Sequence, residues 1–181
     1  MKIEIIDNFL NKEDFESLKS IKLKNIGKKE IKVYHNSISK NKINVECISE
    51  DLIKRLHENY HGVAINILTK LNPAKISLYD YSEFHIIETG SNCEFPIHDD
   101  TPNKLLSGVI YLRPSKNFGT FFYDNKRGKG KHEVEWLENR AVFFSRIERE
   151  TWHSYKGDKK SNRIVMVYNL MTNRIKEVFK A

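Results

Sequence analysis

Residues 76–100 have the sequence ISLYDYSEFHIIETGSNCEFPIHDD, and they set the character of the second half of the chain. Runs rich in isoleucine, phenylalanine and tyrosine are separated here by turn residues such as Gly90 and Asn92. This alternation is typical of short β-strands. It continues as far as residue 170 and predicts strands over Ile76–Tyr81, Phe84–Thr89, Glu94–His98, Leu105–Leu112, Gly119–Tyr123, Glu133–Leu137, Ala141–Ser145, Thr151–Tyr155 and Arg163–Leu170.

Helices are predicted only in front of this β-rich region. Asn11, with Asp14 three residues later, is typical of a helix start. A longer helix is predicted between Ser49, which can cap its first turn, and Pro73, which ends it. Its apolar stripe would pack on one sheet, and it consists of Ile53, Leu56, Tyr60, Val63, Ile67 and Leu71. The polar stretch 24–46 between the two helices is expected to contain one or two short strands.

The pattern of elements predicts a mainly β fold with N-terminal helices, of the α+β class. Because no helical pattern falls between the strands, a parallel α/β sheet is excluded, and a β-sandwich or jelly-roll barrel is expected. The 181 residues are 39% hydrophobic, enough for a packed core. We expect one domain over residues 1–181, with 1–73 as a helical support and 74–171 as the jelly-roll core.

Charge and cysteine content limit the partners and the compartment. Lys and Arg total 31 against 24 for Asp and Glu, a net charge of +7 that is spread along the chain. Such a diffuse excess is more typical of a soluble surface than of a nucleic-acid site. Cys47 and Cys93 fit no metal-binding or disulfide pattern, so free thiols are expected. Without a secretory or membrane-spanning pattern, a cytoplasmic protein with no membrane partner is expected; the oligomeric state stays open.

Two histidines and an aspartate form the candidate chemical centre. His98 and Asp100 are two residues apart at the end of a predicted strand, so their side chains project to one side and that of Asp99 to the other. His153 lies at the edge of a later strand. Two imidazoles and one carboxylate are the protein ligands of many non-haem Fe(II) sites, which keep further coordination positions open. Arg163, ten residues later, can bind a carboxylate through two parallel hydrogen bonds.

These motifs occur in the order His-x-Asp, a Tyr111-Leu112 segment followed by Gly119-Thr120, a distal histidine and an arginine. In this order the sequence resembles the 2-oxoglutarate/Fe(II) dioxygenase superfamily, and within it the small prolyl-hydroxylase-like proteins. The matching segment runs from about residue 76 to residue 170. The resemblance implies a double-stranded β-helix fold. It also implies Fe(II) held by His98, Asp100 and His153, and 2-oxoglutarate held by Arg163.

The same resemblance implies the reaction. O2 would be the second co-substrate, with ascorbate as a further cofactor, and 2-oxoglutarate would be converted to succinate and CO2 while a C–H bond is hydroxylated. One departure from the family pattern is Val165, where some subfamilies have a serine that assists the arginine. Tyr111 is therefore expected to assist Arg163 in binding the co-substrate, with Tyr168 as an alternative. His85, on a strand shortly before the His-x-Asp motif, is expected to contact the substrate.

Other candidates carry weaker predictions. His57 and His61 are four residues apart on the long predicted helix, where a solvated helix face is favoured over a metal site. The loops Ser115–Asn117 and Asn125–Lys131 are predicted to border the pocket.

The leading functional hypothesis is a dioxygenase that hydroxylates a peptide side chain or a small metabolite. One alternative is a nucleic-acid-directed oxygenase, suggested by the net charge of +7. The other is a non-catalytic, cupin-like protein that binds metal or ligand. Fe(II)-dependent formation of succinate from 2-oxoglutarate separates the last from the first two.

Overall fold

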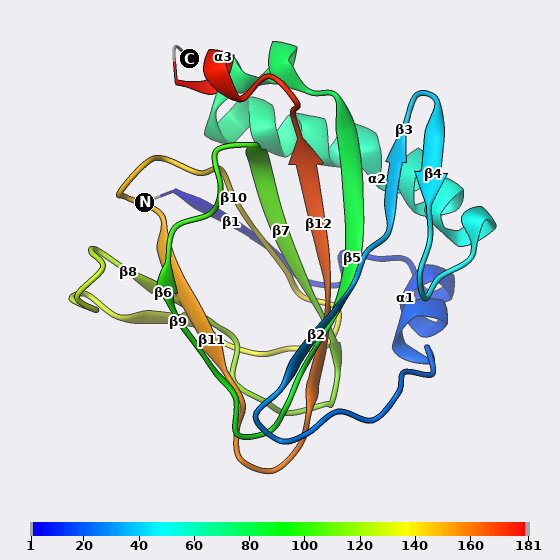
Figure 1. Ribbon diagram of the computed structural model, residues 1–181, viewed down its shortest axis with the longest axis vertical. Coiled ribbons are helices and arrows are strands. Elements are labelled where there is room, and N and C mark those ends of the chain that lie inside the picture. Colours follow the sequence, from blue (N-terminus) through cyan, green and yellow to red (C-terminus); the bar gives the residue numbers. More distant parts are fainter. Residues whose placement is uncertain (1, 180–181) are drawn as a thin grey trace.

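The structure of the protein is a computed structural model, and it describes residues 2–179. Two antiparallel sheets face each other across the lower part of the molecule, and the helices lie on the outer face of the larger sheet (Figure 1). The sheets do not close into a barrel, and the arrangement is the mainly β double-stranded β-helix that the sequence predicts.

The larger sheet has eight strands and is called the major sheet below. Its continuous order is β1 (Ile3–Ile6), β10 (Ala141–Phe144), β7 (Lys104–Arg113), β12 (Arg163–Met171), β5 (Tyr81–Thr89), β3 (Ser37–Ser39) and β4 (Lys42–Asn44), and β2 (Ile31–Tyr34) pairs with β5 beside β3. The minor sheet has four strands in the order β6 (Glu94–His98), β11 (Trp152–Lys156), β8 (Thr120–Tyr123) and β9 (His132–Val134).

Both predicted helices form, and each begins at its predicted capping residue. The side chain of Asn11 accepts a hydrogen bond from the backbone N–H of Asp14 and caps α1 (Lys12–Lys19). The side chain of Ser49 accepts one from the N–H of Leu52 and caps α2 (Glu50–Leu71). These bonds satisfy N–H groups that have no partner within the first turn.

Helix α2 packs on the outer face of the major sheet, as predicted. The hydrophobic cluster between them combines helix residues with strand residues: Ile53, Leu56, Tyr60, Ala64, Ile67 and Leu68 with Phe84, Ile86, Leu105, Leu106 and Ile110. Each leucine, isoleucine or phenylalanine side chain of this cluster stabilises the fold by about 1.5–3 kcal/mol when fully buried. Val63 does not belong to this cluster, although the predicted stripe included it, and it is 40% exposed.

The second hydrophobic cluster lies between the two sheets. Its buried members are Tyr111, Phe122, Val134, Val142, Phe144 and Val165. The central strands β7 and β12 therefore contact a core on each face, which explains why they are buried almost throughout. The inner face of the major sheet also forms one wall of the candidate site.

The structure corrects three local predictions. Residues Pro73–Leu78 form a 3-10 helix, so β5 begins only at Tyr81 and the predicted strand Ile76–Tyr81 does not form; proline at a first helical position favours this turn. Residues 1–73 were expected to be a helical support with one or two short strands, but they supply four strands, β1, β2, β3 and β4, to the major sheet. A short C-terminal helix, α3 (Ile175–Val178), was not predicted. None of the helices in residues 2–179 has the length and apolar character needed to cross a membrane.

Candidate metal centre and its cavity

His98, Asp100 and His153 lie together at one end of the minor sheet. His98 ends β6 and pairs directly with His153 on the antiparallel strand β11, and Asp100 follows two residues after His98. One ligand atom from each of the three side chains lies within 4.8 Å of the others. Asp100 and His153 are buried and His98 is partly buried. The three residues are therefore close enough for one metal ion to bind between them.

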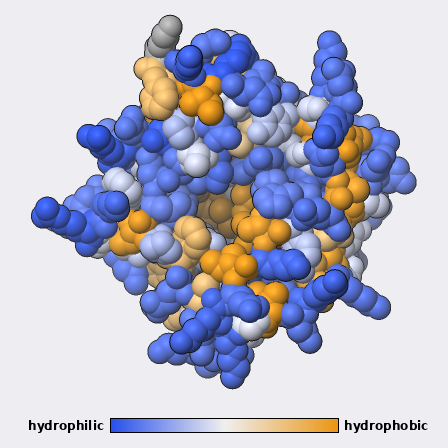
Figure 2. All heavy atoms as spheres, in the orientation of Figure 1, coloured by the Kyte–Doolittle hydropathy of each residue, from blue (hydrophilic) through white to orange (hydrophobic). Residues whose placement is uncertain are grey.

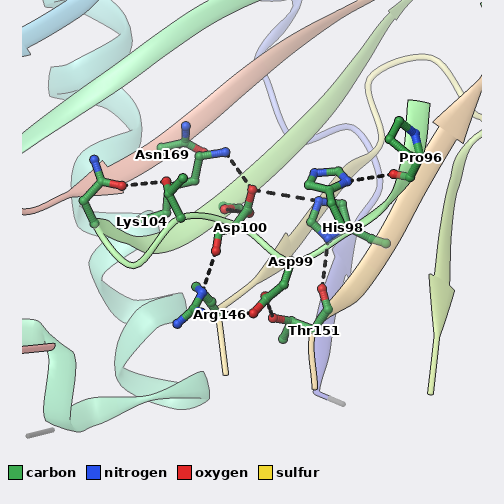
Figure 3. A network of polar contacts seen from close by, with 12 residues as sticks. Pro96, His98, Asp99, Asp100, Lys104, Arg146, Thr151 and Asn169 are labelled. Carbon is green, nitrogen blue, oxygen red and sulfur yellow. Dashed lines mark hydrogen bonds and ion pairs between the residues drawn. The ribbon is translucent and has the colours of Figure 1, made fainter. Parts of the chain in front are cut away.

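The backbone fixes the orientation of both imidazoles. The Nδ1 atom of His98 lies 3.0 Å from the carbonyl oxygen of Pro96, and the Nδ1 atom of His153 lies 3.0 Å from that of Thr151 (Figure 3). A carbonyl oxygen only accepts, so each Nδ1 carries the proton and each Nε2 has a free lone pair. Burial, together with His98, lowers the pKa of His153 below its ordinary value despite the nearby Asp100. The neutral, metal-binding form of His153 is thus favoured.

Asp100 is held as a carboxylate. Burial alone would raise its pKa, but the charges of Lys104 and His153 and the hydrogen bonds from Lys104 and Ser107 lower it to about 2. Lys104 donates to Oδ1 over 2.8 Å and Ser107 donates to Oδ2 over 2.6 Å. Oδ1 also lies 4.0 Å from Nε2 of His153. The carboxylate therefore stands beside the imidazoles in its charged form.

Asp99 points away from the histidines, as expected for the neighbour of Asp100 on an extended chain (Figure 3). Its partners were not predicted. Thr151 donates to its Oδ1 over 2.7 Å, and Arg146 forms an ion pair with its Oδ2 over 3.1 Å. Since the carbonyl of Thr151 also orients His153, Asp99 supports the backbone that positions this imidazole.

The candidate ligands face a cavity of about 220 Å³ between the two sheets. Figure 2 shows a hollow with hydrophobic side chains around it in this face of the molecule. Most of the surface inside the cavity is apolar, although the lining also contains polar residues: Thr89, His98, Asp100, Lys104, Ser107, Thr120, His153, Tyr155 and Arg163. Such an apolar cavity with a few polar groups is typical of a small-molecule site.

Arg163 lines the same cavity and has no anionic partner. It is 2% exposed, and no hydrogen bond or ion pair joins its guanidinium to another residue in 2–179; its Nε atom is buried without an acceptor. The guanidinium carbon lies 4.9 Å from the ring centre of Tyr155 and 5.4 Å from that of Trp136. Burying an unpaired cation costs several kcal/mol, of which cation–π contacts offset about 0.5–2 kcal/mol each. The arrangement suits an anionic ligand.

Of the two tyrosines predicted to assist Arg163, Tyr111 lies near the guanidinium but outside the cavity lining, and Tyr168 lies on the opposite face of the sheet. The hydroxyl of Tyr111 donates to Oγ1 of Thr120 and accepts from its N–H, and its ring stacks on Trp136 behind the cavity wall. Tyr168 stacks on Phe84 in the cluster under α2, on the opposite face of the sheet. The lining instead contains Tyr155 and Thr120, which sequence patterns did not single out.

His85, assigned to the substrate from the sequence, lies on the inner face of the major sheet beside the cavity, outside its lining. Neither predicted loop contributes to the lining among the described residues; two residues of β2, Ile31 and Val33, do. The rings of His57 and His61 contact each other on α2 in a tilted arrangement, and His61 also contacts Tyr79, away from the cavity.

Comparison of folds gives clear matches, although the sequence alone gives none. No protein-family model matches the sequence. No curated protein matches it either. A prolyl-4-hydroxylase from Pseudomonas putida superposes with a TM-score of 0.62 at 13% identity, over 94% of this chain and 92% of that chain.

Two further structures agree. A prolyl hydroxylase from Trichoplax adhaerens, in complex with a hypoxia inducible factor peptide fragment, gives a TM-score of 0.62 at 15% identity, over 97% and 86% of the two chains. An oxidoreductase of the 2OG-Fe(II) oxygenase family from Burkholderia pseudomallei gives 0.63 at 11% identity, over 93% and 84%. The chain therefore has the fold of the 2OG-Fe(II) oxygenases, and prolyl hydroxylases are among the proteins that share it.

Proposed function

We propose that the protein is an Fe(II)- and 2-oxoglutarate-dependent dioxygenase that hydroxylates a C–H bond of a peptide side chain or a small metabolite. One observation carries the proposal: a buried arginine with no anionic partner faces the same cavity as a His-Asp-His cluster. A shared fold alone would not support it, because one fold hosts many functions.

His98, Asp100 and His153 would hold the metal. Two neutral imidazoles and a carboxylate are the donor set that suits Fe(II), and the hydrogen bonds at both Nδ1 atoms leave the Nε2 lone pairs available. Arg163 would hold the distal carboxylate of 2-oxoglutarate in a charge-assisted, bidentate pair. When the ion and both co-substrates are bound, this class of site couples oxidative decarboxylation of 2-oxoglutarate to C–H hydroxylation.

The remaining lining residues would orient the co-substrate and exclude water. Tyr155 in the lining and Trp136 behind it both contact the guanidinium of Arg163, and Val165 fills the position of the missing serine. Tyr111 would act indirectly, by fixing Thr120 through two hydrogen bonds. Because the Trichoplax adhaerens protein is in complex with a peptide, a peptide is a natural first class of substrate to test.

The decisive experiment measures succinate formed from 2-oxoglutarate by the purified protein with and without Fe(II). We expect Fe(II)-dependent turnover in the unchanged protein and none in His153→Ala. Arg113→Met serves as a matched control, since Arg113 donates to the backbone carbonyls of Lys19 and Ile21 outside the cavity. Absence of both succinate formation and 2-oxoglutarate binding would favour a non-catalytic metal-binding protein instead.

A further inference from the structure

A row of polar side chains crosses the inner face of the major sheet next to the candidate metal centre. Ser107 on β7 pairs with Asn169 on β12, and Asn169 pairs with Glu83 on β5. Ser107 donates to Oδ2 of Asp100 over 2.6 Å. Since paired strands lie about 4.8 Å apart, Asn169 is one strand away from the residue that holds a candidate ligand. Figure 3 shows Asn169 close to Lys104 and Asp100.

Asn169 carries an unpaired acceptor. Its Nδ2 donates to Oε2 of Glu83 over 2.9 Å, and because a carboxylate cannot donate, this contact fixes the orientation of the amide. The residue is 1% exposed, and its Oδ1 atom is buried without a hydrogen-bond partner. Along β12, Asn169 projects to the same face as Val165 and Val167, which line the cavity. Because buried acceptors are normally paired, this unpaired oxygen favours binding of a ligand group that can donate a hydrogen bond.

Glu83 is the matching anion. Its carboxylate receives hydrogen bonds from Asn169 and from Nε2 of His85 at 3.3 Å, while the backbone N–H of Asn36 donates to Nδ1 of His85 and so fixes the tautomer. No lysine or arginine forms an ion pair with Glu83 within residues 2–179, and Lys104 is engaged with Asp100. Burial would raise the pKa of Glu83, but His85 and Asn169, with the more distant Lys104, lower it. Its side chain is 15% exposed, so a ligand can approach.

The inner face of the major sheet therefore carries opposite charges at two places along β12: Arg163 lies in the cavity lining, whereas Glu83 and Asn169 lie beside the cavity, outside its lining. Arg163 is an unpaired cation at one end of β12, and Glu83 with Asn169 offers an anion and an unpaired acceptor six residues further along that strand, about 20 Å away at 3.3 Å per residue. The co-substrate proposed above suits the positive end. The negative end suits a group with the opposite charge.

We infer that Glu83 and Asn169 form a subsite for a positively charged nitrogen group of the substrate, an amine or a guanidinium, beside the metal centre. The inference rests on the proposed function for the identity of the metal site and extends it to the class of substrate. Glu83 would supply the charge, Asn169 Oδ1 would accept one N–H, and His85 would act as a positioning residue for the carboxylate. Bound there, the substrate would present its neighbouring C–H groups toward the His-Asp-His cluster.

The test compares two peptides of the same shape and different charge. Acetyl-Gly-Arg-Gly-amide and its citrulline counterpart are titrated by calorimetry into the protein loaded with Mn(II) and 2-oxoglutarate under anaerobic conditions. The arginine peptide is expected to bind at least about tenfold more tightly, as for a hydrogen bond to a charged group. Glu83→Gln should remove this preference, and Asn169→Leu should weaken it. The matched control Glu58→Gln, on the exposed side of α2, should keep it.

The same titrations separate this inference from the proposed function. Glu83→Gln should bind 2-oxoglutarate as the unchanged protein does, and thermal melting verifies that each variant is folded. Equal binding of the two peptides, no binding of either, or an undiminished preference in Glu83→Gln would overturn the subsite. Failure to bind 2-oxoglutarate would overturn the proposed function instead, because the charge preference can also be measured with Mn(II) alone.

Discussion

Replacing Arg163 by methionine should have opposite effects on two quantities. It should raise the stability of the ligand-free protein and weaken its binding of 2-oxoglutarate. The guanidinium is buried without an anionic partner among the described residues, and it makes cation–π contacts with Tyr155 and Trp136. Its uncompensated burial costs several kcal/mol, against about 0.5–2 kcal/mol from each contact. Arg163→Met keeps much of the side-chain volume and removes the charge. We therefore expect the ligand-free variant to be more stable than the unchanged protein by about 1–4 kcal/mol.

In the same variant, the increase in stability caused by 2-oxoglutarate should become smaller. At a concentration 100 times its dissociation constant, a ligand stabilises the native state by about 2.7 kcal/mol. For a chain of this length, each kcal/mol raises the melting temperature by about 2–4 °C. Arg163→Met should lose about 2–5 kcal/mol of binding free energy, a 30-fold to several-thousand-fold weaker affinity. At that concentration, the stabilisation by 2-oxoglutarate should therefore fall from about 2.7 kcal/mol to less than about 1 kcal/mol. Thermal unfolding with and without 2-oxoglutarate measures both effects.

Arg113→Met is the matched control for these melts. The guanidinium of Arg113 donates to the carbonyl oxygens of Lys19 and Ile21 over 2.8 and 2.7 Å, so its loss should destabilise the fold by about 1.5–3 kcal/mol and leave the 2-oxoglutarate shift unchanged. If Arg163→Met instead melted lower than the unchanged protein and kept its shift, Arg163 would be a structural residue and the reasoning would be refuted.

Three further predictions concern the metal centre and helix α2. His153→Ala should bind Mn(II) more than about 100-fold more weakly, since even supporting residues of metal sites contribute 10–100-fold, and calorimetry measures the loss; unchanged affinity would remove His153 from the ligand set. In the same assay, Asp100→Asn should lose metal binding while Asp99→Asn keeps it but melts lower, because its ion pair with an arginine is broken; the reverse ranking would assign the carboxylate to Asp99. Burial lowers the pKa of both His57 and His61, so the unfolded chain binds protons more readily and stability should fall as pH drops below 6.5, by at most about 1.4 kcal/mol per pH unit for each histidine. Urea denaturation at pH 7.5 and 5.5 tests this, and an equal pH dependence in the double alanine variant would contradict it.

Local sequence signals predicted the helices α1 and α2 and the candidate ligands. The caps at Asn11 and Ser49 depend on hydrogen bonds between residues three apart, so the local sequence is enough to predict them. The two-residue spacing of His98 and Asp100 likewise follows from the geometry of one extended strand. The first strand, β1, and the pairing of β2–β4 with β5 could not be predicted in the same way, because their partners are distant in the chain.

The sequence by itself determined which residue types are available for chemistry: two imidazoles, a carboxylate and an arginine in a fixed order. Only the tertiary structure decided how they are used. The register of β6 against β11 sets His98 beside His153, and the packing of the two sheets leaves Arg163 buried without an anion. The pairing of β12 with β5 sets Asn169 against Glu83, 86 residues apart in the chain. Strand register and burial arise from contacts between distant segments, so no local pattern encodes them.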